Sequence, residues 1–150
     1  MTEIPYVMKD CPAMRLMIDT NIILDILLER WPFYVQSRTI LSLCEKKDIY
    51  GFISASTATD IFYLVRKALG STDEAYNALG HILNIVKILT VTNDDVNCAF
   101  LQRAKDFEDC LLAVCAKSNS CDGIVTRNKK DFLSFDISVY SPDEIVELMK

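Results

Sequence analysis

Short, mainly apolar runs alternate along this chain with longer stretches in which apolar residues recur at helical spacing. The first run, residues 15–18, ends in the polar turn that begins at Asp19. A short apolar run ending in a polar turn is typical of a buried parallel strand. Comparable runs occupy residues 50–53, 88–91, 123–126 and 137–140. The pattern therefore predicts five β-strands.

One or two amphipathic stretches follow each predicted strand. We expect helices over 22–29, 33–47, 57–69, 72–86, 94–103 and 106–117, and a last helix that begins at Ser141 and Pro142. Strands that alternate with helices indicate a parallel sheet covered on both faces. The predicted fold class is therefore α/β, a three-layer α/β/α sandwich around a five-stranded parallel sheet.

The chain is expected to contain one folded domain. Its 150 residues match the size of a single domain. Residues 1–13 contain Pro5 and Pro12, mixed charge and no apolar period, so they predict a loosely ordered N-terminal extension. Residues 14–150 then form the domain, and Met14 is an alternative start of the protein.

Composition and charge exclude several classes of protein. Hydrophobic residues make up 51% and charged residues 25% of the chain, which is a globular composition. No apolar run approaches the roughly 18 residues that a membrane span needs. Six cysteines without a CxxC pair, and a single histidine, His81, make a zinc finger improbable. Without a secretory signal, we expect reduced cysteines in a cytoplasmic protein with no membrane partner.

Polar side chains follow several predicted strands, and functional groups gather beyond the carboxyl ends of such strands. The candidates are Asp19 and Asn21 after the first strand, Asp60 in the first turn of the helix after the second, Asp106 and Asp109 at the start of the helix that leads to the fourth, and Thr126, Arg127 and Asn128 after the fourth. These residues are expected to meet in one cleft.

Helix capping offers a structural explanation for several of them. Asp60 lies three residues after Thr57, and Asp109 lies three residues after Asp106, which is the spacing of capping residues at a helix start. Asn21 can likewise cap the first predicted helix. Each candidate taken alone is therefore ambiguous.

Taken together, the acids favour a cation site. Carboxylates packed closely repel each other, and a fold tolerates that poorly unless a cation lies between them. Oxygen ligands without His or Cys favour a hard ion, Mg²⁺ or Mn²⁺. Such an ion suits phosphodiester hydrolysis, because it activates water and neutralises the phosphate.

Three segments of the chain resemble motifs of one family. Residues 18–25 (Ile-Asp-Thr-Asn-Ile-Ile-Leu-Asp) resemble the first motif of the PIN-domain family, which includes the VapC-type toxins. Residues 106–113 and 126–132 resemble its third and fourth motifs. The resemblance covers residues 14–142 and is fairly specific, because the first and fourth motifs occur together at this separation.

The resemblance implies a five-stranded parallel sheet, a Mg²⁺ or Mn²⁺ requirement and endonucleolytic cleavage of RNA. It implies Asp19, Asp109 and Asp60 as metal ligands, with Asp19 central. Asn21 and Thr126 would orient ligands, water or phosphate by hydrogen bonds.

This chain departs from the family pattern at two positions. The second motif usually offers Glu, where this chain has Asp60, and the fourth often has Asp, where this chain has Asn128. Asp131 can supply the missing charge, although it can equally be a solvated loop residue. The predicted catalytic set is therefore Asp19, Asp60, Asp109, Asn21, Thr126, Asn128 and Asp131.

The resemblance also implies partners: RNA, a small antitoxin and a second copy of the chain. A net charge of -5 requires a local basic group to hold RNA, and Arg127, Lys129 and Lys130 are expected to contact it. Trp31, Phe33 and Tyr34 could belong to an antitoxin surface, but aromatic residues are more often core.

Other functions are less consistent with these residues. A phosphatase of the haloacid-dehalogenase type needs a second Asp two residues after Asp19, where Asn21 stands, and nucleotide-binding glycine motifs are absent. A PIN-fold binding or scaffold protein with weak or no nuclease activity remains the alternative, motivated by Asp60 and Asn128.

Overall fold

A five-stranded sheet, parallel throughout, forms the centre of the molecule in the computed structural model, which describes residues 13–150. The strands are β1 (Met14–Ile18), β2 (Ile49–Ser54), β3 (Lys87–Leu89), β4 (Gly123–Val125) and β5 (Val139–Tyr140), in the spatial order β3-β2-β1-β4-β5. The predicted α/β class and five-stranded sheet are confirmed. The predicted N-terminal extension lies, except for residue 13, outside the described residues.

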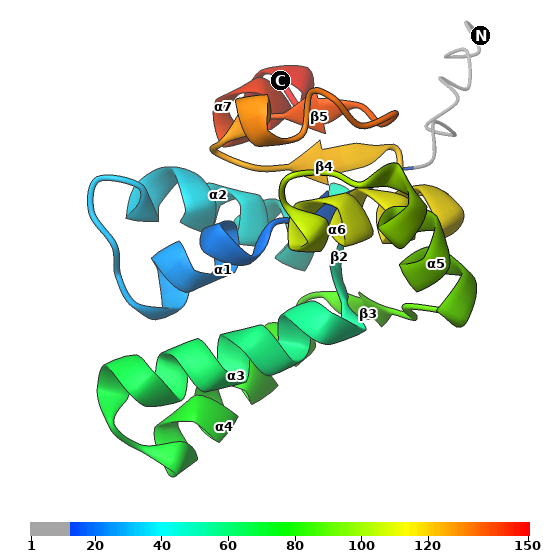
Figure 1. The fold of residues 1–150 in the computed structure, drawn as a ribbon. Coiled ribbons are helices and arrows are strands. Elements are labelled where there is room, and N and C mark those ends of the chain that lie inside the picture. The colour runs from blue at the N-terminus through cyan, green and yellow to red at the C-terminus, as the bar shows by residue number, and fades with distance from the viewer. Residues whose placement is uncertain (1–12) are drawn as a thin grey trace, which may run out of the picture.

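Helices cover both faces of this sheet (Figure 1). They are α1 (Thr20–Leu27), α2 (Tyr34–Glu45), α3 (Ala55–Leu69), α4 (Thr72–Leu83), α5 (Asn93–Gln102), α6 (Phe107–Ser118) and α7 (Pro142–Leu148), and a short 3-10 helix spans Lys129–Asp131. No helix in residues 13–150 is both long and apolar enough to cross a membrane.

Alternating side chains of the central strand feed two separate cores, as the period of a strand requires. Leu16 and Ile18 pack with buried residues of α1, α2, α3, α4 and α7. Met17 points the other way and packs with buried residues of α6 and with Phe52. Because β1 is buried on both faces, its sequence is a continuous apolar run rather than an alternating one.

Several predicted boundaries are wrong by a few residues, and two of the shifts change the meaning of candidate site residues. Helix α1 begins at Thr20, so Asn21 lies inside it and does not cap it. Helix α3 begins at Ala55 and is capped by Ser54, whose hydroxyl accepts from the Thr57 amide at 3.1 Å. The capping explanation of the Thr57 and Asp60 spacing is therefore wrong.

Aromatic residues near the start of α2 are not core, contrary to the expectation from their type. Trp31 is 68% exposed and Phe33 is 37% exposed. Three of the five cysteines in the described part, Cys44, Cys110 and Cys115, are buried, and all five are free thiols. Cys11 lies outside the described residues.

Gly123, at the start of β4, allows β5 to approach closely. A Cβ at this position would lie 2.6 Å from Cε2 of Tyr140 and 2.8 Å from the carbonyl oxygen of Ser138. That carbonyl accepts a hydrogen bond from the Ile124 amide at 2.9 Å, so it cannot move away without losing this bond. The glycine therefore allows the close packing of residues 138–140 against the strand that leads into Thr126.

We expect Gly123→Ala to lower the free energy of unfolding by about 1–3 kcal/mol, because an added methyl overpacks this contact. Gly80→Ala is the matched control. A Cβ there meets nothing within 4 Å, so alanine in helix α4 should instead stabilise by about 0.5–1 kcal/mol. Urea denaturation of both variants tests the contact, and a neutral Gly123→Ala would contradict it.

Candidate functional site

Asp19 occupies the junction between β1 and α1, at the carboxyl edge of the sheet. It is 8% exposed, and Thr126 Oγ1 donates a hydrogen bond to its Oδ2 at 2.8 Å. The same hydroxyl accepts from the Asn128 backbone N–H at 3.1 Å. Since the Thr126 hydroxyl has one proton, this chain of bonds directs it at the carboxylate and orients Asp19.

Burial raises the pKa of the Asp19 carboxyl, because the charged form loses hydration. The hydrogen bond from Thr126 and the positive charge of Arg127 act in the opposite direction, and the negative charge of Asp131 raises it further. Two predicted site residues, Thr126 and Asp131, thus act directly on Asp19.

The first turn of α6 contributes two more carboxylates near Asp19, those of Glu108 and Asp109. Asp106 caps this helix, with its Oδ1 accepting from the Asp109 amide at 2.9 Å, as the spacing predicts. Burial raises the pKa of Asp109 to about 7, and the charges of Asp106, Asp19, Asp131 and Glu108 raise it in the same direction. Acids from three separate segments therefore repel one another here.

Asp60, on α3, reaches this group through Glu108. Burial raises the pKa of Glu108, and so do the charge of Asp60 and a hydrogen bond between the two side chains. Glu108 was not among the predicted site residues. It lies inside the segment 106–113 that resembles the third motif, but only its neighbours Asp106 and Asp109 have the three-residue spacing of a helix cap.

A narrow cleft joins these elements. It is lined by Asp19, Thr20, Ser54, Ser56, Thr57, Glu108, Asp109 and Leu112. The cleft holds about 10 Å³, which is room for roughly one water-sized or ion-sized occupant. The Ser54 hydroxyl lies 3.0 Å from that of Ser56 and 2.9 Å from that of Thr57, so hydroxyl groups form one wall.

The donor chemistry of this cleft fits a hard divalent cation. Its ionisable donors are carboxylates. Burial is the main cause of the raised pKa values of Asp19, Glu108 and Asp109, and the negative charges of neighbouring acids add to it, so a bound cation would stabilise the charged forms. In residues 13–150, however, no three Asp, Glu, His or Cys side chains lie close enough to form a finished ligand set. Metal ligation by Asp19, Asp60 and Asp109 stays a prediction.

The arrangement matches one known family in sequence. A sequence model of the family described as PIN domain matches residues 15–130. The chain belongs to the PIN-domain family. It is also 30% identical over 141 residues to Ribonuclease VapC1 of Aquifex aeolicus, an alignment that covers 89% of this chain and 94% of that protein. The resemblance proposed from the three segments is confirmed.

Solved structures share the fold of this PIN domain. The DNA-bound VapBC of Salmonella typhimurium aligns with a TM-score of 0.67 at 16% identity, over 86% of this chain and 98% of that chain. VapBC2 of Rickettsia felis, bound to a DNA fragment from the promoter, aligns with a TM-score of 0.65 at 17% identity, over 85% and 98%. At these identities the likeness concerns the fold alone.

An ion pair between Arg127 and the buried Asp25 connects two segments that form the site of this PIN domain. Arg127 donates from Nε to Asp25 Oδ2 at 2.9 Å and from Nη2 to Oδ1 at 3.2 Å, and Ser37 also donates to Asp25 Oδ2, at 3.0 Å. The Asp25 side chain is 0% exposed. Arg127 also lies over the ring of Phe33, 4.0 Å from its centre. The pair ties the residue after Thr126 to the helix after Asp19.

Asp25 was another residue without a predicted role, although a signal existed. It is a lone acid among the apolar residues 22–26, a position that a carboxylate occupies only with a partner. The partner is Arg127, which was expected to contact RNA. The structure places its guanidinium on Asp25, and RNA contact by Arg127 stays a prediction.

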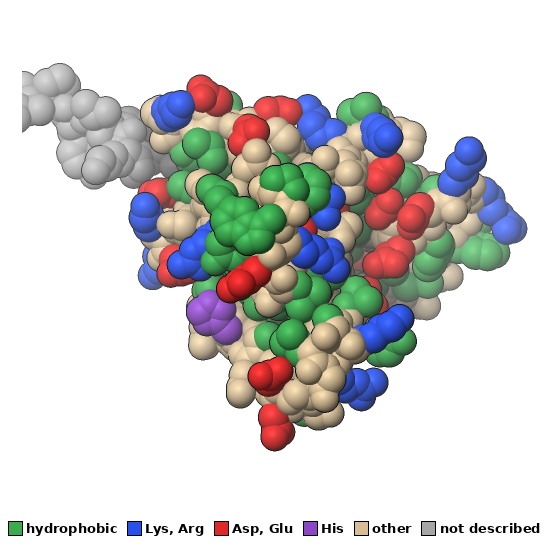
Figure 2. Space-filling view, turned by 90° about the vertical axis from the view of Figure 1, so that its left-hand side faces the viewer, with side chains coloured by type: hydrophobic (Ala, Val, Ile, Leu, Met, Phe, Trp, Pro, Cys, Tyr) green, Lys and Arg blue, Asp and Glu red, His purple; other side chains and the backbone are tan. Residues whose placement is uncertain are grey.

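The other predicted residues differ in their surroundings. Asn21 Oδ1 accepts from Arg30 Nη1 at 3.4 Å. Lys129 pairs with Glu144 at 2.5 Å, while Lys130 is exposed and makes no ion pair within residues 13–150. Figure 2 looks onto the left side of Figure 1, where acidic side chains gather right of centre and basic side chains border them.

Asp109→Asn should stabilise the metal-free protein more at pH 8 than at pH 5. The folded protein holds the Asp109 proton up to about pH 7, whereas the unfolded chain releases it near pH 3.8. The free energy of unfolding therefore falls as pH rises between these values, and removing the carboxyl relieves that loss. We expect a gain of about 1 kcal/mol at pH 8.

Urea denaturation at both pH values, with EDTA present, measures this difference. Asp73→Asn is the control, because it removes an exposed carboxylate from the first turn of α4. Equal effects of Asp109→Asn at pH 5 and pH 8 would contradict the raised pKa.

Arg127→Met should lower the free energy of unfolding by about 3–5 kcal/mol, because Asp25 would remain buried without its partner. Lys129→Met removes the same charge two residues away. It breaks a pair whose side chains are 38% and 46% exposed, so it should cost less than about 1 kcal/mol. Thermal and urea denaturation compare the variants, and similar losses would exclude a special role for the buried pair.

Proposed function

We propose that this chain is a Mg²⁺- or Mn²⁺-dependent endoribonuclease that serves as the toxin of a toxin–antitoxin pair. Membership of the PIN-domain family and a sequence identity of 30% with Ribonuclease VapC1 support the proposal. The observation on which it depends is the group of mutually repelling carboxylates around the buried Asp19, at the carboxyl edge of a parallel sheet. A cation bound among these carboxylates would offset their repulsion.

Asp19 and Asp109 are the proposed primary ligands of the ion, with Glu108 or Asp60 completing the set. These residues line or border one cleft of ion size. A bound Mg²⁺ or Mn²⁺ supplies activation of the attacking water and neutralisation of phosphate charge. The cleavage is proposed to be hydrolytic and to leave a 5′-phosphate and a 3′-hydroxyl.

The residues of the chain have separate tasks in this proposal. Thr126 orients the Asp19 carboxylate through a hydrogen bond of 2.8 Å. The exposed Ser56, which borders the same cleft, offers its hydroxyl as a hydrogen-bond donor to a phosphate oxygen. Asp131 is exposed and adds negative charge near Asp109, with which it lines one cavity. Asn128 contributes its backbone N–H to Thr126 and leaves its side-chain amide for phosphate.

A protein partner is also proposed. Two of the structural neighbours are VapBC complexes, which motivates an antitoxin as partner of this chain. Its proposed docking surface is the turn before α2, where Trp31 is 68% exposed and its ring lies 5.2 Å from that of Tyr34. Large aromatic side chains that remain in water are enriched at protein interfaces. A second copy of the chain stays a predicted partner.

A PIN-fold binding protein without robust catalysis is the second candidate. One observation favours it: no finished ligand set of three acidic, His or Cys side chains exists in the part of the chain that the structure describes. Asp60, one methylene shorter than the usual Glu, contacts Glu108. A nuclease assay separates the two candidates.

We expect the purified chain to cleave single-stranded RNA with Mg²⁺ or Mn²⁺ and to lose this activity in excess EDTA. Asp19→Asn should reduce the rate on the order of 10²-fold or more, a few kcal/mol of barrier, because it removes the central carboxylate. The 5′ and 3′ ends of the products, identified by enzymatic end-labelling, test the chemistry.

Asp73→Asn again serves as the control, since it removes one carboxylate far along the chain from the cleft and should retain activity. Robust cleavage in EDTA would refute the metal dependence. A chain that binds RNA but does not cleave it with either metal would favour the binding protein.

A further inference from the structure

Two of the cations that follow β4 are already paired. Arg127 is held by Asp25 and Lys129 by Glu144. RNA is a polyanion, and the acids around Asp19 repel it until free positive charge compensates. The positive charge that holds RNA must therefore come from other side chains.

Two exposed lysines meet this requirement on the α6 side of the site. Lys105 lies in the loop before α6, and Lys130 lies in the 3-10 helix after β4. Neither forms an ion pair with the residues that the structure describes. Twenty-five residues separate them in the chain, yet both line one cavity.

This cavity directly adjoins the candidate catalytic group. It holds about 400 Å³ and is lined by Ala104, Lys105, Asp106, Asp109, Lys130, Asp131, Ser134 and Phe135. Asp109 lines both this cavity and the narrow cleft at Asp19. The cavity and the narrow cleft therefore lie on either side of one carboxylate.

Phe135 gives the cavity a fixed apolar wall. Its ring packs edge-on against Phe132, with ring centres 6.2 Å apart, and Phe132 is 1% exposed. An aromatic wall beside lysines is the combination with which proteins hold single-stranded nucleic acid, since bases pack on the ring while the backbone meets the cations. The volume falls within the range of small-ligand sites.

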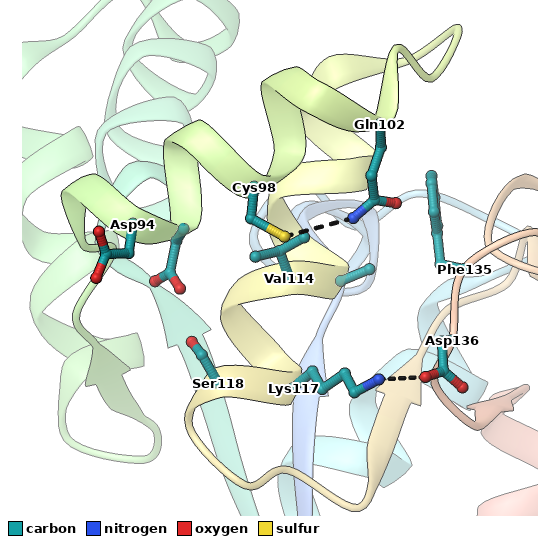
Figure 3. Close-up of a pocket in the computed structure, with 10 residues that line it drawn as sticks. Asp94, Cys98, Gln102, Val114, Lys117, Ser118, Phe135 and Asp136 are labelled. Atoms are coloured by element: carbon teal, nitrogen blue, oxygen red, sulfur yellow. Dashed lines mark hydrogen bonds and ion pairs between the residues drawn. The ribbon is translucent and has the colours of Figure 1, made fainter.

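Two other cavities lack this connection. One of about 410 Å³ lies between α5 and α6, where Figure 3 shows Lys117 paired with Asp136 and Cys98 beside Gln102. Another, of about 570 Å³, lies at the amino ends of β1 and β2 and includes Arg15 and Tyr50. Neither is lined by Asp19 or Asp109.

We propose that the cavity of Lys105, Lys130 and Phe135 binds the nucleotide adjacent to the scissile phosphate of a single-stranded RNA. The two lysines contact its phosphate, and the base lies against Phe135. This inference rests on the proposed nuclease function and names the substrate subsite for it. It also narrows the expected RNA contacts from Arg127, Lys129 and Lys130 to Lys130, and adds Lys105.

The test measures RNA binding apart from cleavage. A fluorescein-labelled single-stranded RNA is titrated with Asp19→Asn protein in Mg²⁺ at several salt concentrations, and anisotropy gives the association constant. The double variant Lys105→Gln/Lys130→Gln should bind at least about 10-fold more weakly at low salt. The slope of log K against log salt should fall in magnitude by about 0.7, the value for one lost phosphate contact on a single strand.

Two further variants make the result specific. Lys117→Gln/Lys150→Gln removes the same charge from two lysines in exposed ion pairs, and should leave both affinity and slope nearly unchanged. Phe135→Leu should weaken binding with an unchanged slope, because it removes a base contact and no charge.

Equal weakening by the two lysine pairs would overturn the subsite, because it would show only a general effect of net charge. An unchanged slope in Lys105→Gln/Lys130→Gln, or no RNA binding by the Asp19→Asn protein, would also overturn it. Failure of the nuclease proposal is seen separately, as a wild-type chain that binds RNA through these lysines but does not cut it.

Discussion

The pairing of β1 with β4 is the constraint on which the site depends. Leu16, Met17 and Ile18 lie in register with residues 123–125, and the Asp19 amide extends this ladder by donating to the Val125 carbonyl at 3.0 Å. One step further, the Thr126 hydroxyl meets the Asp19 carboxylate. Parallel strands end at a common edge, so two residues 107 positions apart are brought into contact by backbone geometry.

The carboxyl edge of the sheet also brings together negative charges whose repulsion destabilises the folded protein. Helix α6 presents Glu108 and Asp109 to Asp19, and the pKa of Asp109 rises to about 7 because burial and four neighbouring acids disfavour its ionised form. Stabilising contacts elsewhere must offset this repulsion. Active sites commonly contain such unfavourable arrangements, since binding of the ligand removes them.

The ion pair between Asp25 and Arg127 is one of those offsetting contacts. It lies behind the site, with its carboxylate fully buried and satisfied by Arg127 and Ser37. Because Arg127 follows Thr126 directly, and Asp25 belongs to the helix that follows Asp19, the pair joins the two segments whose ends form the Asp19–Thr126 contact. Its positive charge also opposes the rise in the pKa of Asp19. Arg127 thus both connects the two segments and lowers the pKa of Asp19.

The sequence by itself determined the fold class and the order of elements, because short apolar runs that alternate with amphipathic stretches favour buried parallel strands covered by helices. It also predicted that Asp19 and Thr126 would lie at the ends of neighbouring strands, where the structure places them in contact. It also determined that Asp106 caps α6, since that bond is local.

The sequence could not determine the partners of charged side chains, because these depend on distances across the sheet. Arg127 and Lys129 are alike as cations beside a strand end, yet one is bound to Asp25 and the other to Glu144. Only the tertiary structure showed that Glu108 joins Asp60 to the acids, and that Lys105 and Lys130 face one cavity from segments 25 residues apart. Local pattern specifies which residues end a strand or start a helix, whereas packing decides which of their side chains meet.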